Sequence, residues 1–86
     1  MKNVVYLLLS EKDKRTYLGS TDNIERRITE HNQGKTPSTK NRRPLQLIYQ
    51  EEFDTLIEAR NREHYLKTRE GRVDLKEIFK QINIGD

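Results

Sequence analysis

The stretch VVYLLLSEKDKRTYLG, residues 4–19, predicts the centre of the fold because two apolar segments flank a charged turn. Val4 to Leu9 is a continuous apolar run, rich in β-forming residues, with the length of a buried strand. Arg15 to Gly19 is a second, shorter candidate strand, and the polar link between the two suits a hairpin. The hairpin would bring the phenol groups of Tyr6 and Tyr17 near each other.

The next segments predict a helix and then a third strand. Asp22-Asn23-Ile24-Glu25 has the form of a helix start, with Asp22 as the N-cap and Glu25 three residues further on. Gly34 supplies the C-terminal stop. A polar loop follows, and Leu45 to Phe53 is predicted as the third strand.

The remainder of the chain predicts two more helices. Thr55-Leu56-Ile57-Glu58 is a second capping box. The helix that it opens should run to about Thr68 or Arg69, before Gly71. A final helix is predicted from about Val73 to Ile82, where apolar residues recur at helical spacing.

Length and composition narrow the class of protein. We expect one domain, residues 1–86, with an α+β fold: a small three-stranded antiparallel sheet flanked by about three helices. The sequence has no cysteine and only two histidines, His31 and His64, which excludes thiolate and His-based structural metal sites. The apolar runs are too short to cross a membrane and lack the pattern of a signal peptide. We therefore expect an intracellular, cytoplasmic protein with no membrane partner.

Positive charge is concentrated in the first half of the chain. Residues 1–49 contain ten Lys and Arg against five Asp and Glu, a net of +5, whereas residues 50–86 contain seven against nine, a net of −2. The polar loop before the third strand contributes four of these cations: Lys35, Lys40, Arg42 and Arg43. This pattern fits contacts to a nucleic-acid backbone, although a solvated loop would have the same composition.

Two polar side chains lie on the face of the first helix that is predicted to pack. The helical stripe that starts at Ile24 continues through Arg27, Ile28 and His31. Arg27 and His31 are four residues apart and are therefore neighbours on one face. Both could instead lie at the edge of the buried stripe, with the arginine head in water.

The second helix has the same kind of anomaly. Its stripe runs through Leu56, Ala59, Glu63 and Leu66, so a carboxylate interrupts an apolar face. Such a carboxylate is costly unless it is paired or binds a cation. The alternatives are an ion pair with a cation such as Arg27, or an exposed edge position. Two tyrosines, an arginine, a histidine and a glutamate thus aim at one region, which is typical of a functional site.

The ordered combination of these residues resembles the GIY-YIG nuclease superfamily, to which the N-terminal nuclease domain of a bacterial excinuclease belongs. The first signature corresponds to Val4-Val5-Tyr6 and the second to Tyr17-Leu18-Gly19. Arg26 to Asn32 is similar to the family's Arg-x-x-x-His segment, and Glu58 to Lys67 to the helix with its single acidic residue. The likeness covers about Val4 to Phe79 and suggests a small, free-standing member. Val replaces Gly in the first motif and Leu replaces Ile in the second, and no position with a chemical role is lost.

The resemblance implies a metal-dependent endonuclease that hydrolyses DNA phosphodiester bonds. Glu63 would bind Mg²⁺ or Mn²⁺, which take oxygen ligands and keep several waters. Arg27 would contact the scissile phosphate. Tyr6 would activate or orient the attacking water, and Tyr17 and His31 would orient water and phosphate or relay a proton.

The remaining expectations concern the backbone, the DNA and protein partners. Gly19 either permits a close approach or an unusual dihedral, or is a simple turn glycine.

The expected contacts to DNA phosphates come from five cations: Lys35, Lys40, Arg42, Arg43 and Lys67. No separate DNA-reading domain is visible in the sequence, so we expect structure-selective or non-specific cleavage. The alternatives are a catalytically weak nucleic-acid-binding module, or a component of a larger repair or recombination complex whose protein partner supplies specificity.

Overall fold

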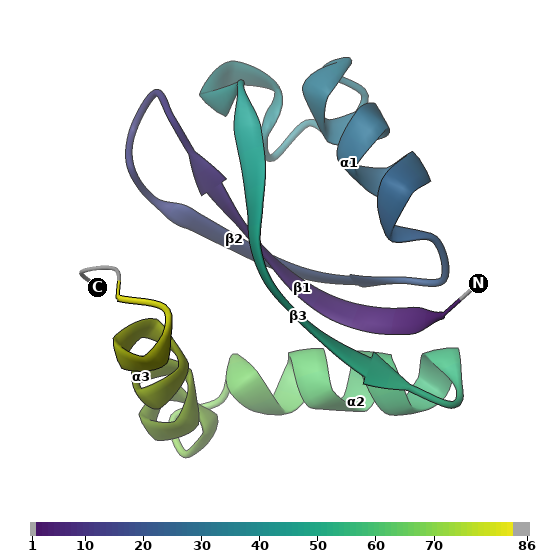
Figure 1. Ribbon diagram of the computed structural model, residues 1–86, viewed down its shortest axis with the longest axis vertical. Coiled ribbons are helices and arrows are strands. Elements are labelled where there is room, and N and C mark those ends of the chain that lie inside the picture. Colours follow the sequence, from purple (N-terminus) through teal and green to yellow (C-terminus); the bar gives the residue numbers. More distant parts are fainter. Residues whose placement is uncertain (1, 84–86) are drawn as a thin grey trace.

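The computed structural model describes residues 2–83, which form a three-stranded antiparallel sheet with helices on both faces (Figure 1). This confirms the predicted α+β fold. The strand order is β2-β1-β3, so the most apolar strand lies at the centre. The elements in chain order are β1 (Asn3–Ser10), β2 (Thr16–Thr21), α1 (Ile24–Asn32), the short 3₁₀ helix η1 (Lys40–Arg42), β3 (Leu45–Phe53), α2 (Leu56–Leu66) and α3 (Gly71–Gln81).

The central strand β1 is buried on both faces, which explains why its sequence is a continuous apolar run. Alternate side chains point to opposite faces. Tyr6 belongs to the cluster that packs against α1, whereas Leu7 belongs to the cluster that packs against α2 and α3. Figure 1 shows α1 on one side of the sheet and both α2 and α3 on the other. The sheet therefore separates the two helices that were predicted to contribute site residues.

The helix termini confirm part of the sequence prediction and correct the rest. Thr55 and Glu58 form the predicted capping box of α2. The N-cap of α1 is Asn23 rather than Asp22, because the Asn23 side chain accepts the hydrogen bond from the backbone N–H of Arg26. Gly34 has a φ of 79°, as expected for the residue that ends a helix.

Gly71 is the first residue of α3 rather than a boundary before it, so this helix begins two residues earlier than predicted. A Cβ atom at Gly71 would lie 1.8 Å from the backbone oxygen of Tyr65. The corner between α2 and α3 is thus too tight for any side chain at this position. The glycine marks a close contact between two helices, which the sequence alone presents as a simple helix stop.

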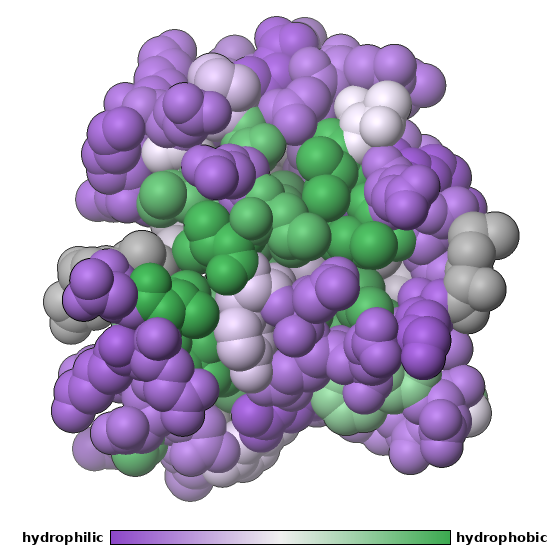
Figure 2. All heavy atoms as spheres, in the orientation of Figure 1, coloured by the Kyte–Doolittle hydropathy of each residue, from purple (hydrophilic) through white to green (hydrophobic). Residues whose placement is uncertain are grey.

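Polar residues cover most of the face drawn in Figure 2, while apolar residues gather in a band across its middle. Over residues 2–83, the helices are too short and too polar to span a bilayer. The candidate site residues lie on the sheet and on the two helical layers that pack against it.

Candidate active site

Tyr6 reaches the edge of the sheet because the residue opposite it has no side chain. Tyr6 lies on the central strand and pairs with Gly19 on the edge strand β2. A Cβ atom at Gly19 would lie 2.6 Å from the Tyr6 hydroxyl oxygen and 2.7 Å from Cζ. Gly19 lies inside β2 rather than in a turn. Its role is the close approach that lets the phenol lie across β2.

His31 is completely buried and holds the Tyr6 hydroxyl. Its Nε2 lies 3.0 Å from the Tyr6 oxygen, and its Nδ1 lies 2.7 Å from Oγ1 of Thr39, which is also buried. Burial, with a smaller effect from the charge of Arg27, lowers the pKa of His31 to about 4. The imidazole is therefore neutral at pH 7, and the predicted inward position of His31 on α1 is correct.

Tyr17 packs against both of these rings. Its ring centroid lies 5.0 Å from that of His31 in an edge-on arrangement, and 6.4 Å from that of Tyr6. Such tilted contacts between rings are favourable and fix their orientation. The hairpin thus brings the two phenol rings together as the sequence predicted.

Arg27 lies at the rim of this ring cluster. Its Nε donates a 3.4 Å hydrogen bond to the Tyr6 oxygen, and its Nη1 donates a 3.1 Å hydrogen bond to Glu30. Burial raises the pKa of Tyr6 to about 12, although the hydrogen bond from Arg27 acts in the opposite direction. Tyr6 is therefore a neutral phenol at pH 7, with a cationic neighbour that can stabilise charge on its oxygen.

Glu63 approaches the same edge strand from the opposite helical layer. Its carboxylate accepts a 2.5 Å hydrogen bond from the Ser20 hydroxyl on β2 and a 2.6 Å hydrogen bond from Nζ of Lys67. The ion pair that was one alternative for Glu63 is present, but its partner is Lys67 rather than Arg27, which pairs with Glu30. The charge of Glu63 makes a small contribution to the raised pKa of Tyr6, well below that of burial.

The donor set around Glu63 fits a weakly held hard cation. Among residues 2–83 no group of three acidic, histidine or cysteine side chains is arranged to enclose a metal. A single carboxylate beside the Ser20 hydroxyl matches the way Mg²⁺ is often bound, by one or two carboxylates, several waters and substrate phosphate. The ammonium of Lys67 against Glu63 shows that the position accommodates positive charge.

A cleft of about 370 Å³ lies where the end of β2 meets α1 and α2. It is lined by Ser20, Thr21, Asp22, Arg26, Arg27, Glu30, Leu56 and Arg60. Ser20 and Arg60 are among the lining residues that were not predicted as site residues. Ser20 follows the second signature directly, and Arg60 is three residues before Glu63 and so on the same side of α2. That spacing is the signal that could have identified Arg60.

The predicted DNA-binding cations do not all share one environment. Arg42 is held by Asp13 at 2.7 Å and donates to the backbone oxygen of Thr16, so it ties the loop to the hairpin. The hydrogen bond from Arg42 lowers the pKa of Asp13 to about 2. Lys35, Lys40 and Arg43 are exposed at the C-terminal end of α1 and in the following loop, whereas Lys67 lies on α2 beside Glu63.

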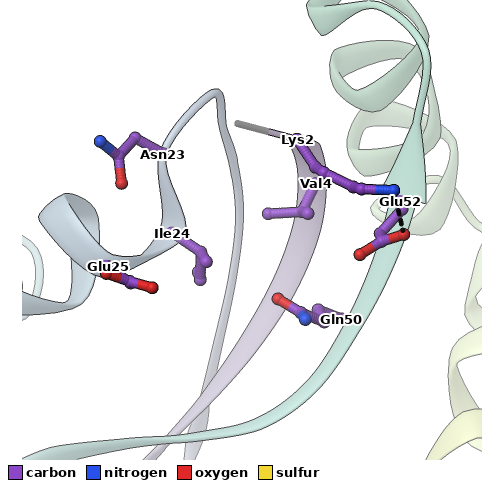
Figure 3. A pocket seen from close by; sticks show the side chains of 7 residues that line it. All are labelled: Lys2, Val4, Asn23, Ile24, Glu25, Gln50 and Glu52. Atoms are coloured by element: carbon purple, nitrogen blue, oxygen red, sulfur yellow. Dashed lines mark ion pairs between the residues drawn. The ribbon is translucent and has the colours of Figure 1, made fainter.

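A separate hollow of about 280 Å³ lies at the other end of α1, between the helix start and the strands β1 and β3 (Figure 3). Its charged groups neutralise each other in part, since Lys2 and Glu52 form a 3.5 Å ion pair. Its lining contains none of the predicted site residues: it consists of Lys2, Val4, Asn23, Ile24, Glu25, Gln50 and Glu52. The chemistry expected from the sequence gathers at β2 instead.

The chain is similar in sequence to a known protein family. The family model described as "GIY-YIG catalytic domain" matches residues 2–77. A UPF0213 protein of Staphylococcus saprophyticus is 45% identical over 78 residues, covering 90% of this chain and 94% of the relative. A UPF0213 protein of Haloquadratum walsbyi is 40% identical over 96% of this chain and 98% of its own. The solution NMR structure of a UPF0213 protein from Bacillus halodurans is similar at a TM-score of 0.51 and 32% identity, over 91% of this chain and 85% of that one.

Proposed function

Because this chain belongs to the GIY-YIG family of nuclease-type domains, we propose that it is a metal-dependent endonuclease that hydrolyses DNA phosphodiester bonds. The observation that supports this most directly is the meeting of two helical layers at one edge strand. Tyr6 and Arg27 approach β2 from the α1 side, and Glu63 approaches it from the α2 side. Arg27 and Ser20 line the cleft at this edge, and they are hydrogen-bond partners of the buried Tyr6 and of Glu63, respectively.

Each side chain has a role that follows from its chemistry. Arg27 binds the scissile phosphate, since a guanidinium matches phosphate oxygens geometrically and offsets charge in the transition state. Tyr6 orients the attacking water through its hydroxyl, with His31 and Tyr17 holding the phenol in place. Glu63 would hold the Mg²⁺ or Mn²⁺ ion, which would supply neutralisation of phosphate charge and acidification of coordinated water. Lys67 then contacts phosphate instead of the carboxylate.

The proposed substrate choice rests on the motifs that these residues contain. Residues 1–86 match a nuclease domain over most of their length and show no helix-turn-helix or zinc-finger pattern. We therefore infer cleavage that is structure-selective or non-specific, with any sequence preference supplied by a protein partner. Exposed cations near the end of α1 favour contacts to the DNA backbone.

The test is a cleavage screen over duplex, nicked, flapped and branched DNA with Mg²⁺ or Mn²⁺, using the wild type and Glu63→Gln. The glutamine keeps the shape of the side chain but removes its charge, and we expect the rate to fall by at least about 100-fold. Glu77→Gln, an exposed carboxylate on α3, is the matched control and should cleave normally. Undiminished cleavage by Glu63→Gln would refute the assigned role. DNA binding without cleavage in either metal would favour a binding module.

A further inference from the structure

Thr39 is a polar residue whose side chain is completely buried in the loop between α1 and β3. It precedes η1, but its side chain does not cap that helix. Its Oγ1 instead lies 2.7 Å from Nδ1 of His31, on the side of the imidazole that faces away from Tyr6. A buried hydroxyl in this position can determine which histidine nitrogen has the proton.

The distances indicate that the Thr39 hydroxyl is the donor in this contact. With oxygen as the acceptor, hydrogen bonds from O–H groups are most often about 2.7–2.8 Å long and those from N–H groups about 2.9–3.0 Å long, and the 2.7 Å contact matches the first class. The other acceptor near this hydroxyl is the backbone oxygen of Thr36, at 3.5 Å. That oxygen already accepts the backbone N–H groups of Thr39 at 3.1 Å and Lys40 at 2.9 Å. Both observations favour donation from Thr39 to Nδ1 of His31.

The direction of the remaining bonds follows from this one. A neutral imidazole has one donor and one acceptor nitrogen, so an accepting Nδ1 places the proton on Nε2. The separation of 3.0 Å between Nε2 and the Tyr6 oxygen is typical of an N–H donor. Arg27 also donates to this oxygen through Nε. Tyr6 therefore receives two N–H donors, and its own O–H is left to point elsewhere.

We propose that Thr39 is a positioning residue that holds His31 in the Nε2–H tautomer and thereby makes His31 a hydrogen-bond donor to the Tyr6 oxygen. Its catalytic consequence rests on the proposed nuclease function, whereas the tautomer itself does not. Two donors at the phenol oxygen stabilise negative charge on it and direct the Tyr6 hydroxyl proton away from His31. In this arrangement His31 does not accept the Tyr6 proton.

The tautomer can be read directly from the ¹⁵N chemical shifts of the histidine ring nitrogens in the free protein. We expect wild-type His31 to show a protonated Nε2 and an unprotonated Nδ1 at pH 7, with exposed His64 as the internal reference. Thr39→Val removes the hydroxyl at nearly constant shape, so both tautomers of His31 should be populated. Thr39→Ser keeps a hydroxyl and should retain the Nε2–H tautomer. A protonated Nδ1 in the wild type, or an unchanged tautomer in Thr39→Val, would overturn the proposal. The wild-type spectrum decides the matter even if the valine variant does not fold.

Cleavage kinetics supply a second readout that a purely structural role would not produce. We expect Thr39→Val to lower kcat about tenfold, the effect of losing roughly one hydrogen bond in the transition state, with KM within about twofold of the wild type. Thr39→Ser should recover most of that loss. An equal fall in both variants would contradict the assigned role of the hydroxyl. Failure of the wild type to cleave any DNA would count against the nuclease function alone, since the spectra test the tautomer independently.

Discussion

At the scale of single residues, His31 makes the stability of the protein depend on pH. Burial lowers its pKa from an ordinary value near 6.5 to about 4, so the folded state resists protonation that the unfolded chain accepts. His31 therefore contributes stability above pH 6.5, and this contribution is lost as the pH falls toward 4. Between pH 7 and pH 5 we expect a loss of about 1–2 kcal/mol.

The measurement is urea unfolding at pH 7 and pH 5 for the wild type and His31→Gln. Glutamine does not titrate, so the variant should lose about 1–2 kcal/mol less than the wild type over this interval. Carboxylates such as Asp13 titrate in both proteins and cancel in the comparison. Equal losses would show that protonation of His31 is not coupled to unfolding.

The residues at the site differ in how visible they are in the sequence. Arg27, His31 and Glu63 could be found because each interrupts an apolar helical stripe, an anomaly that depends only on local spacing. Thr39 and Ser20 could not be found in this way. Each acts through a contact with a residue on another element of the fold, and threonine and serine are ordinary in loops and strand ends.

At the scale of elements, the edge strand β2 lies between the two helical layers and contacts site residues from both of them. Gly19 leaves room on this strand for the Tyr6 ring, because a Cβ atom there would lie 2.6 Å from the Tyr6 hydroxyl oxygen. Gly19→Ala should therefore push the phenol out of place, destabilise the fold by about 1–3 kcal/mol and lower kcat by at least about tenfold.

The matched control is Leu75→Ala, which removes packing on α3, on the far side of the sheet from Tyr6. It should also destabilise the protein by about 1–3 kcal/mol but leave cleavage by the folded protein unchanged. Thermal unfolding and cleavage well below both transitions separate the two effects. If both variants lose activity in proportion to stability, the specific role of Gly19 would be excluded.

The elements themselves follow closely from the sequence, whereas their boundaries depend on tertiary contacts. The third strand has the predicted bounds of Leu45–Phe53, because turn residues and a helix cap delimit it on both sides. The N-cap of α1 could not be chosen from sequence, since Asp22 and Asn23 are both good capping residues. The start of α3 at Gly71 depends on the close approach of the α2 backbone, which no local pattern reveals.

At the scale of the whole molecule, the distribution of charge predicts which face meets DNA. Lys35 lies in the loop after α1 and Lys40 lies in η1, on the side of the sheet that holds Tyr6, whereas Lys76 and Lys80 lie on α3 across the sheet. Removing either pair lowers the net charge from +3 to +1. The two double variants therefore differ in where charge is lost and not in how much.

We expect Lys35→Ala/Lys40→Ala to weaken binding to duplex DNA about tenfold and to reduce the slope of log K against log salt by about 1–2, since each phosphate contact contributes about 0.9. Lys76→Ala/Lys80→Ala should change the slope by less than about 0.5, because we expect the two lysines on α3 to make no contact with the DNA. Fluorescence anisotropy across a salt series without divalent metal measures both quantities and prevents cleavage during the titration. Equal weakening by the two variants would mean that net charge alone attracts DNA, and the face with α1 would lose its assignment as the binding surface.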